Sequence, residues 1–514
     1  MNLASLVDIP ALIAPDAPAL IGTRAVDYAT LRSAVGSGAG LLSELGVGHG
    51  DRVGIFATNS VEVIEVMFAA ASLGAVVVPM NYKAKQREVA HLLSDSGVKV
   101  LVTETRYVGL IEDARPENVE HVLMLDTDAA DGWRRRAAEA DELFEIAEVD
   151  DRQLCVLLYT SGTTSLPKGV MLTHGALTDY VMGRAEPADG DDHGRMLLAA
   201  PLYHIAGVTS MLGALYSGRT VVIMSQFDAD EWFDLVERER ATHAFLVPTM
   251  LARLIDHPDL GSRDLSSLEV ITYGAAPMPP AVIRRALELL PSSVGFSQAY
   301  GQTETTSTVT VLTPDDHRIE GAEEEIAVKL RRLGSVGRPV DDVELRVVGD
   351  DGEELGSFEI GQVQLRTPRQ MTGYWGSGSS RTAETIDDEG WIHTGDLGHV
   401  DDGGYLFLGG RSGEMIIRGG ENVSPQEIES VLYDHPDVLE AGVVGVPDEE
   451  WGERILAVVV LRPNSELDLE TMREYCREQL AGFKRPDVIH IVEQLPRTST
   501  GKLLRRDLAA LIAG

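Results

Sequence analysis

The chain has 514 residues and a mass of 55.6 kDa, which is too long for one compact core and predicts roughly two to four domains. Its 81 aspartates and glutamates outnumber its 44 lysines and arginines, and the net charge of −37 argues against nucleic acid or an anionic membrane as the main partner. An anionic substrate would therefore need a local cluster of cations inside its site.

The cysteine count and the chain start bear on the compartment. Cys155 and Cys476 lie far apart, so the sequence offers neither a disulfide framework nor zinc-ligand spacing. No basic region followed by an apolar stretch opens the chain, and no run approaches the ~20 apolar residues of a membrane span. We therefore expect a cytoplasmic protein without an integral membrane span, and both a monomer and a homodimer fit the sequence.

Short apolar runs alternate with segments of helical period through the first four fifths of the chain. Helices are predicted at 61–73 and 88–96. The runs of strand length lie at 52–56, 75–79, 98–103, 221–223, 244–247, 269–272 and 294–296. Because strand, helix and strand follow one another repeatedly, we predict an α/β fold whose parallel-rich sheets carry helices on both faces.

The pattern changes at about residue 340. Alternating segments at 343–348 and 362–366 flank the acidic turn Asp350–Gly352, which is typical of a small antiparallel β unit. We predict that this β-rich part covers 340–410 and completes a large N-terminal domain, 1–410.

A second domain is predicted after the glycine-rich stretch Gly409–Gly413. Helix signals recur at 424–433, which begins with Ser-Pro-Gln-Glu, and at 469–480. We therefore predict that residues 411–514 form a smaller α+β C-terminal domain.

The stretch 159–168, YTSGTTSLPK, places small hydrogen-bond donors and one lysine directly after the apolar run 154–158. Such a loop after a strand can hold phosphate oxygens. It is not the usual P-loop, because Pro167 precedes the lysine and Gly169 follows it. Taken alone, the composition favours a Ser/Thr-rich surface turn.

Four further motifs accompany this loop along the chain. In order, the five stretches are 159–169, 300–304 (YGQTE), 391–396 (WIHTGD), 410–411 with 419–422 (GGEN), and 496–502 (PRTSTGK). Together, over nearly the whole chain, they resemble the adenylate-forming superfamily of acyl- and aryl-CoA synthetases, adenylation domains and luciferases. The local sequence is most similar to bacterial fatty-acyl-CoA synthetases and 4-coumarate-CoA-ligase-like enzymes.

The resemblance implies a two-step reaction. A carboxylic acid, a medium- to long-chain fatty acid or a simple aryl acid, would react with ATP in the presence of Mg²⁺ to give an acyl-adenylate and pyrophosphate, and CoA would then displace AMP. One alternative is an acyl-AMP ligase that loads an acyl carrier protein. Another is a non-catalytic adenylate-binding protein, which would be marked by loss of Glu304, Asp396 or Lys502, all of which are present.

The resemblance also assigns the nucleotide site. The residues expected to hold the ATP phosphates are Thr160, Ser161, Gly162, Thr163, Thr164 and Lys168. Those expected around adenosine are Gly274, Ala275, Ala276, Tyr300, Gly301, Asp396 and Arg411. Thr303 would bond the α-phosphate, and Glu304 with Thr163 would ligate Mg²⁺.

The C-terminal domain would contribute to both half-reactions. By resemblance, Lys502 bridges the carboxylate and ATP during adenylation, although most lysines are solvated surface residues. Gly413 would be the hinge about which the domain rotates, and CoA would meet Gly419, Gly420 and Glu421. Gly413 stands where many relatives have Asp or Lys, and Ser165 stands where they usually have Gly.

The acyl pocket is expected at Tyr203, Ile205, Gly274 and Ala299. His204 would act catalytically on the route to the thiol, or would be a capping histidine at the edge of the core. Amino-acid-activating relatives carry Asp at the position of Ile205, and a buried ammonium without a carboxylate partner is costly. The apolar residue therefore disfavours amino acids.

Overall fold

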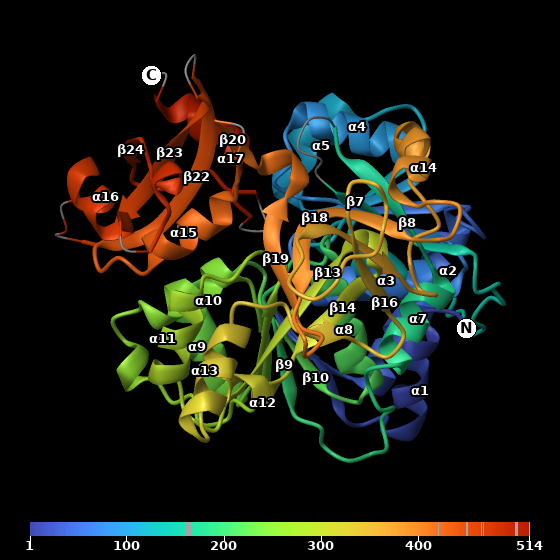
Figure 1. Cartoon of the computed structure of the whole chain (residues 1–514). Helices are drawn as coiled ribbons and strands as arrows, with labels where there is room; N and C mark the ends of the chain where they lie inside the picture. Colours follow the sequence, from blue (N-terminus) through green and yellow to red (C-terminus); the bar gives the residue numbers. More distant parts are fainter. Residues whose placement is uncertain are drawn as a thin grey trace.

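The computed structural model describes residues 1–160, 166–419, 421–448, 451–463, 465, 467–477, 479–498 and 502–512. Most of these residues form a larger lobe built on two large sheets, and the remainder form a smaller C-terminal lobe (Figure 1). The α/β fold class predicted from the alternating runs is confirmed.

The first large sheet has nine strands in the order β15-β14-β13-β12-β11-β9-β10-β1-β2. Its members are β1 (Pro18–Ile21), β2 (Ala25–Asp27), β9 (Arg195–Leu198), β10 (Thr220–Ile223), β11 (His243–Leu246), β12 (Val270–Gly274), β13 (Gly295–Gln302), β14 (Ser307–Leu312) and β15 (Arg338–Pro339). The six central strands are parallel, whereas β2 at one edge and β14 and β15 at the other are antiparallel.

The second large sheet has six strands in the order β6-β5-β3-β4-β7-β8. They are β3 (Arg52–Phe56), β4 (Val76–Pro79), β5 (Val100–Thr103), β6 (His121–Met124), β7 (Leu154–Thr160) and β8 (Lys168–Thr173). All pairs are parallel except β7 and β8, which are antiparallel and form a hairpin. The predicted phosphate loop connects these two strands.

Helix α3 (Val61–Ser72) is buried on every side. Ser60 begins it by accepting a hydrogen bond from the Val63 amide. Because the helix is apolar nearly all round, it lies inside one hydrophobic core that also takes side chains from β3 and β10. The two large sheets therefore share a core.

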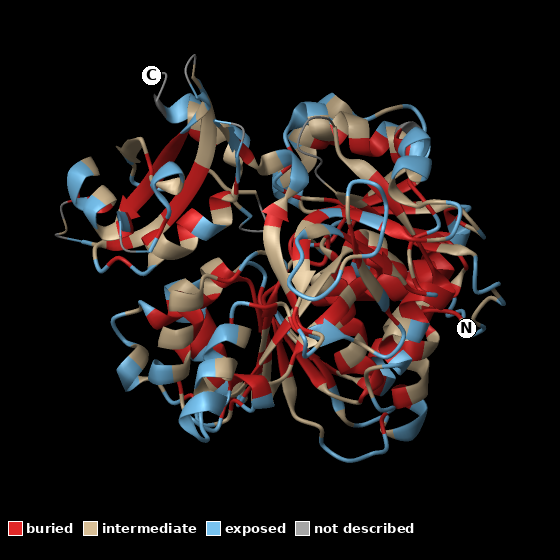
Figure 2. Ribbon diagram, in the orientation of Figure 1, coloured by how far each residue is buried: buried red, intermediate tan, exposed pale blue. Residues whose placement is uncertain are grey.

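The other helices of the larger lobe cover the sheets, and buried residues concentrate beneath them (Figure 2). They are α1 (Ser5–Ile13), α2 (Tyr28–Glu44), α4 (Gln86–Ser96), α5 (Val108–Ala114), α6 (Trp133–Glu139), α7 (His174–Met182), α8 (Ile205–Tyr216), α9 (Ala229–Glu239), α10 (Pro248–Ile255), α11 (Pro280–Leu289), α12 (Pro314–His317), α13 (Glu323–Arg332) and α14 (Thr382–Thr385).

A third, antiparallel sheet completes the larger lobe. Its strands are β16 (Glu344–Val348), β17 (Gly361–Arg366), β18 (Ile392–Val400) and β19 (Leu406–Arg411). The predicted small β unit is therefore correct. The last strand, β19, ends at Arg411. Arg411 is therefore the last residue of this sheet, whereas the sequence predicted it as the first residue of the C-terminal domain.

The smaller lobe has its own mixed sheet and core. Its elements are β20 (Ile416–Arg418), β21 (Glu421–Val423), α15 (Pro425–Tyr433), β22 (Val438–Asp448), β23 (Gly452–Leu461), α16 (Leu469–Arg477), β24 (Val488–Ile491) and α17 (Arg505–Leu508). Among the described residues, no hydrophobic cluster contains side chains from both lobes.

The lobes meet through polar contacts. Arg284 of α11 pairs with Asp434 at 2.6 Å, and Arg462 pairs with Asp256 at 3.3 Å. The Ser424 hydroxyl, which also caps α15, donates to the carbonyl of Gly409. The smaller lobe is thus held beside α10 and α11 by charges rather than by a shared core.

Two predicted elements differ in length from the observed ones. Strand β13 continues to Gln302, well past the predicted end at residue 296, because polar and small residues replace the apolar pattern where the strand forms the site. Helix α16 covers Leu469–Arg477, and Leu480, the predicted end, lies in a bend after it. The other predicted helices and strands match to within about two residues at each end.

Because each lobe has its own hydrophobic core, a core mutation in one lobe should destabilise that lobe alone. Leu432 is fully buried in the smaller lobe, and Leu432→Ala should destabilise that lobe by about 2–5 kcal/mol. Hydrogen exchange should then accelerate in β22 and β23 but not in α3. Leu511→Ala, at a side chain 37% exposed, is the control and should leave both regions protected. Equal acceleration in both lobes would contradict two independent cores.

Candidate functional site

Three side chains converge on the carboxylate of Asp396, which lies in β18 and is buried. The Tyr300 hydroxyl donates to Oδ2 at 2.6 Å, and the Gln302 amide donates to the same oxygen at 3.0 Å. The Arg411 guanidinium pairs with Oδ1 at 2.7 Å. Each carboxylate oxygen keeps acceptor capacity, so Asp396 is held in place but can still accept hydrogen bonds from a ligand.

The tyrosine of this group is held in its neutral form. Burial raises the pKa of Tyr300 well above its ordinary value, and the adjacent charge of Asp396 raises it further. Tyr300 therefore stays protonated and donates to Asp396 throughout the physiological range.

The β12–β13 edge beside Tyr300 requires small residues. Gly274, the last residue of β12, pairs with Ala299, and a Cβ at position 274 would lie 2.1 Å from the Ala299 carbonyl oxygen. The next residue, Ala275, is exposed and has a left-handed backbone with φ +66. The strand therefore ends in a sharp turn at Ala275, and the small residues Ala275 and Ala276 follow it.

A second polar group forms around the residues after β13. Thr303 and Glu304 lie in one short turn, and Glu304 Oε1 accepts a hydrogen bond from the Tyr374 hydroxyl at 2.8 Å. The Lys168 ammonium lies 5.0 Å from the centre of the Tyr374 ring. Burial lowers the pKa of Lys168, Arg381 lowers it further, and Glu304 opposes both effects. A cation and a carboxylate thus lie close together at the loop end of the β7–β8 hairpin.

The predicted phosphate loop is only partly described. Ser161, Gly162, Thr163, Thr164 and the departure at Ser165 lie outside the described residues. Thr160 and Lys168, which flank them, are paired across β7 and β8.

Side chains of helix α4 bind the residues on either side of the phosphate loop. The His91 imidazole donates from Nε2 to the Pro167 carbonyl at 2.8 Å. The Tyr159 hydroxyl donates to Asp95 Oδ2 at 2.8 Å, and the Trp375 indole donates to the Asp95 carbonyl at 2.9 Å. The entry to the loop and its exit are therefore fixed by residues of one helix.

His204 and Lys502 come from different lobes but act on each other electrostatically. Burial lowers the pKa of His204 to about 4, with a second contribution from the charge of Lys502. Desolvation also lowers the pKa of Lys502, followed by Arg411, while Glu414 and Asp396 oppose the shift. Lys502 thus lies within electrostatic range of His204 and Asp396.

His204 also caps a helix. Its Nδ1 accepts a hydrogen bond from the Ala206 amide at 3.4 Å at the start of α8. The sequence left a capping histidine and a residue on the substrate route as alternatives. The structure shows the cap, and the same residue lies near Lys502.

Tyr203 and Ile205, on either side of His204, are buried. The Tyr203 ring packs edge-on against Tyr82 with centroids 5.4 Å apart. Ile205 belongs to the main hydrophobic core, and one turn further along α8 the Thr209 hydroxyl lies 3.1 Å from that of Ser307. The first turn of α8 after His204 is therefore apolar up to Thr209.

The residues expected to meet CoA lie in the smaller lobe. Gly419 has φ +60, and a Cβ there would lie 3.2 Å from the Trp451 ring, so glycine is required. Glu421 begins β21 and is exposed. Gly420 lies outside the described residues.

Sequence reasoning missed two partners at these sites. Gln302 lies within a recognised motif, and the period of a strand places it on the same face as Tyr300, so that signal was available. Tyr374 is separated from Glu304 by 70 residues, and no local pattern links the two.

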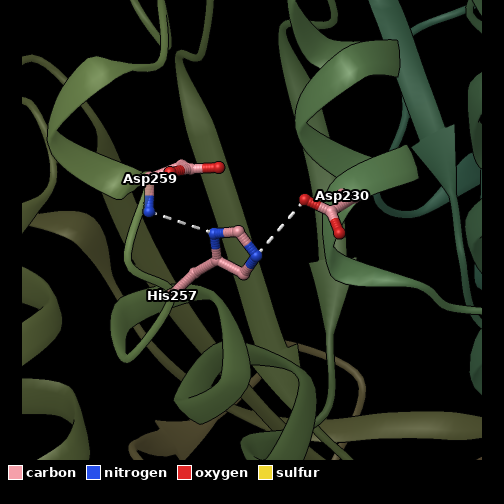
Figure 3. A group of neighbouring side chains, drawn as sticks. All are labelled: Asp230, His257 and Asp259. Carbon is pink, nitrogen blue, oxygen red and sulfur yellow. Dashed lines mark hydrogen bonds and ion pairs between the residues drawn. The ribbon is translucent and has the colours of Figure 1, made fainter.

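A separate group, Asp230, His257 and Asp259, has the composition of a metal site (Figure 3). His257 Nδ1 accepts from the Asp259 amide at 3.3 Å, and its Nε2 lies 3.3 Å from Asp230 Oδ1. Arg263 lies 3.6 Å from the same carboxylate. Because both imidazole nitrogens have partners and a guanidinium is nearby, the group is a surface ion-pair cluster.

Two family models match the chain. The model described as AMP-binding enzyme matches residues 11–375, and the model described as AMP-binding enzyme C-terminal domain matches residues 427–502. The chain belongs to the AMP-binding enzyme family.

Named relatives of this AMP-binding enzyme align with it over more than nine tenths of their length. It is 35% identical over 519 residues to indoleacetate–CoA ligase of Aromatoleum aromaticum, covering 100% of the chain and 98% of the relative. It is also 35% identical over 501 residues to fatty acid–[acyl-carrier-protein] ligase ScoC of Streptomyces coeruleorubidus, covering 96% and 93%.

A solved structure gives the same result. ATP-bound MatB from Rhodopseudomonas palustris matches with a TM-score of 0.88 and 29% identity over 99% of each chain. The enzyme is therefore an AMP-forming acid–thiol ligase that activates a carboxylic acid with ATP and transfers it to CoA. No helix among the described residues is long and apolar enough to cross a membrane.

Lys502 should affect only one half-reaction if it acts during adenylation alone. We expect Lys502→Ala to slow ATP–pyrophosphate exchange by ~10²–10³, as for other lost electrostatic contacts to a transition state. The same variant should convert presynthesised acyl-adenylate and CoA to acyl-CoA at nearly the wild-type rate. Equal loss in both assays, in a folded variant, would mean that Lys502 acts throughout.

Gly413 tests the predicted hinge. A Cβ at this position meets nothing within 4 Å, so Gly413→Ala fits the orientation described here and should keep adenylation intact. Gly413→Pro fixes φ near −65° and removes an amide proton, so adenylation and thioester formation should change unequally. If proline reduced both rates by the same factor, with alanine as the matched control, the hinge would have to lie elsewhere.

Proposed function

We propose that the acid is hydrophobic and carries no second charge, either a medium- to long-chain fatty acid or a simple aryl acid. The observation that carries this proposal is Ile205, which is buried at the start of α8 in a core lined by apolar side chains. A substrate ammonium there would lose its hydration without gaining a carboxylate partner. Burying each methylene of an acyl chain would instead contribute about 0.8 kcal/mol.

The relatives support both acid classes. One is named for an aryl-substituted acetate and another for fatty acids, at the same 35% identity. The pocket residues Tyr203, Ile205, Gly274 and Ala299 would accept the acyl group from α8 and from the β12–β13 edge. Ala299 adds one methyl group to the pocket wall, which favours medium-length chains over very long ones.

Adenosine would bind at the Asp396 group. The free acceptor capacity of this carboxylate suits the two ribose hydroxyls, and Arg411 would orient it. The Tyr300 ring and the small residues 274–276 would enclose the adenine, with Gly301 beside it. Thr303 would donate to the α-phosphate from the turn that follows.

The phosphates and Mg²⁺ would lie toward Lys168. The Glu304 carboxylate, oriented by Tyr374, is the hard oxygen ligand that Mg²⁺ prefers, and Thr163 is its proposed second ligand. Mg²⁺ supplies charge neutralisation for the leaving pyrophosphate. Lys168 adds the local positive charge that the acidic chain requires, and Thr160 would complete the phosphate grip with residues 161–164.

Lys502 would stabilise the charge that develops between the acid carboxylate and the α-phosphate. His204, with its pKa near 4, would be neutral and would line the route by which the thiol arrives. For the second half-reaction the smaller lobe would rotate about Gly413, which removes Lys502 and brings Gly419, Gly420 and Glu421 to the CoA thiol.

The name of the ScoC relative favours one alternative acceptor, an acyl carrier protein. Parallel assays with CoA and with a holo-carrier protein, using the same acyl-adenylate, decide between them. We expect CoA to be the faster acceptor. A carrier protein that reacts faster at equal concentration would reverse this assignment.

Ile205 gives a direct test of the acid class. Ile205→Asp would place an uncompensated carboxylate in the core, at a cost of several kcal/mol, and should lower ATP–pyrophosphate exchange with octanoate or cinnamate by at least about 100-fold. Ile205→Val, the control, should change it by less than about tenfold. Undiminished exchange in the aspartate variant would show that Ile205 does not line the acid pocket.

A further inference from the structure

Arg369, in the segment after β17, has a fully buried side chain. Its guanidinium Nη1 donates to the carbonyls of Thr305 at 2.8 Å and Thr306 at 3.1 Å, and its Nη2 donates to that of Thr308 at 2.7 Å. Its Nε donates to Asp342 Oδ2 at 2.6 Å. One planar side chain therefore collects three main-chain carbonyls and a carboxylate, and the three carbonyls belong to one turn.

That turn has an unfavourable backbone. Thr306 has φ 51 and Ser307 has φ 73, both in the left-handed region although neither is glycine. The β-carbon of a side chain makes this conformation unfavourable, and it persists only where the surroundings impose it. The Arg369 contacts impose it here, since they bind the carbonyls on both sides of the strained pair.

The turn lies directly after the proposed ATP residues. Glu304 immediately precedes it, and the Glu304 carbonyl accepts from the Met371 amide at 2.9 Å. The Tyr374 hydroxyl holds the Glu304 carboxylate at 2.8 Å. The segment that contains Arg369 therefore contacts Glu304 through its main chain and its side chain and also fixes the turn that follows.

The other end of the turn, at Ser307, contacts the helix that carries the proposed acid-pocket residue Ile205. Ser307 Oγ lies 3.1 Å from Thr209 Oγ1, which in turn donates to the Ile205 carbonyl at 2.9 Å. A change in the backbone of this turn would therefore displace both Glu304 and the first turn of α8.

The carboxylate partner is less enclosed. The Asp342 side chain is 36% exposed and also pairs with Arg184 at 3.2 Å. The counter-ion of Arg369 is thus partly exposed to solvent, whereas the carbonyls that Arg369 binds in the turn are reached by its buried guanidinium. The carbonyl contacts, rather than the ion pair, define the shape of the turn.

We propose that Arg369 is a positioning residue for adenylation, which holds the strained turn 305–308 so that Thr303 and Glu304 face the ATP phosphates. This inference rests on the roles proposed above for Thr303 and Glu304. A lysine cannot replace Arg369, because a single ammonium lacks the planar fork that reaches carbonyls on two sides.

The test compares Arg369→Lys with Asp342→Asn, which keeps every carbonyl contact of Arg369 and removes only the counter-charge. We expect Arg369→Lys to lower kcat for ATP–pyrophosphate exchange about 10–100-fold and to raise the Mg²⁺ concentration for half-maximal activity severalfold. Asp342→Asn should change each quantity by less than about threefold. If Arg369→Lys does not fold, Arg369→Gln, which keeps a planar donor, takes its place in the same assays.

A merely structural role would give a different result. It would lower Tm and the amount of active enzyme but leave KM for ATP and the Mg²⁺ dependence of the folded fraction unchanged, and that outcome would overturn the proposal. Glu304→Gln is measured in parallel. If Glu304→Gln leaves the Mg²⁺ dependence unaltered, the role proposed for Glu304 is wrong, whereas an effect of Glu304→Gln without one of Arg369→Lys rejects Arg369 alone.

Discussion

The buried carboxylate of Asp396 is the interaction on which the site depends. It joins the nine-stranded sheet, through Tyr300 and Gln302, to the small sheet that carries Asp396 and Arg411. Its charge also acts on Lys502 of the smaller lobe. A buried carboxylate is tolerated only with partners of this kind, so the need to satisfy Asp396 constrains how the nine-stranded sheet and the small sheet meet.

The positions of the cations in the site can be understood from the net charge of the chain. A chain with a net charge of −37 repels ATP at long range, and its cations must therefore be placed individually. Arg411 pairs with Asp396 at 2.7 Å, the charges of nearby carboxylates act on Lys168 and Lys502, and desolvation lowers the pKa of both lysines. Lys168 is half-buried, which strengthens its interaction with a phosphate relative to that of a cation on the open surface.

The sequence predicted most of the fold, because strands and helices bury regular faces and leave a readable period, as in β3 and α3. It also indicated the motif residues of the site. It could not predict Tyr374 or Arg369, because Tyr374 lies 70 residues from Glu304 and Arg369 bonds main-chain carbonyls 61 to 64 residues away. Thr306 and Ser307 carry no glycine or asparagine signal for a left-handed turn, so only the folded context reveals that conformation.

The polar contact between the lobes has a thermodynamic consequence. The Arg284–Asp434 and Arg462–Asp256 pairs are partly exposed, and no hydrophobic cluster of the described residues spans the two lobes. Separating such surfaces uncovers little apolar area, so the heat capacity would change little on reorientation of the smaller lobe. The balance between its orientations would then vary weakly with temperature but shift with ionic strength, because dissolved salt screens exposed ion pairs.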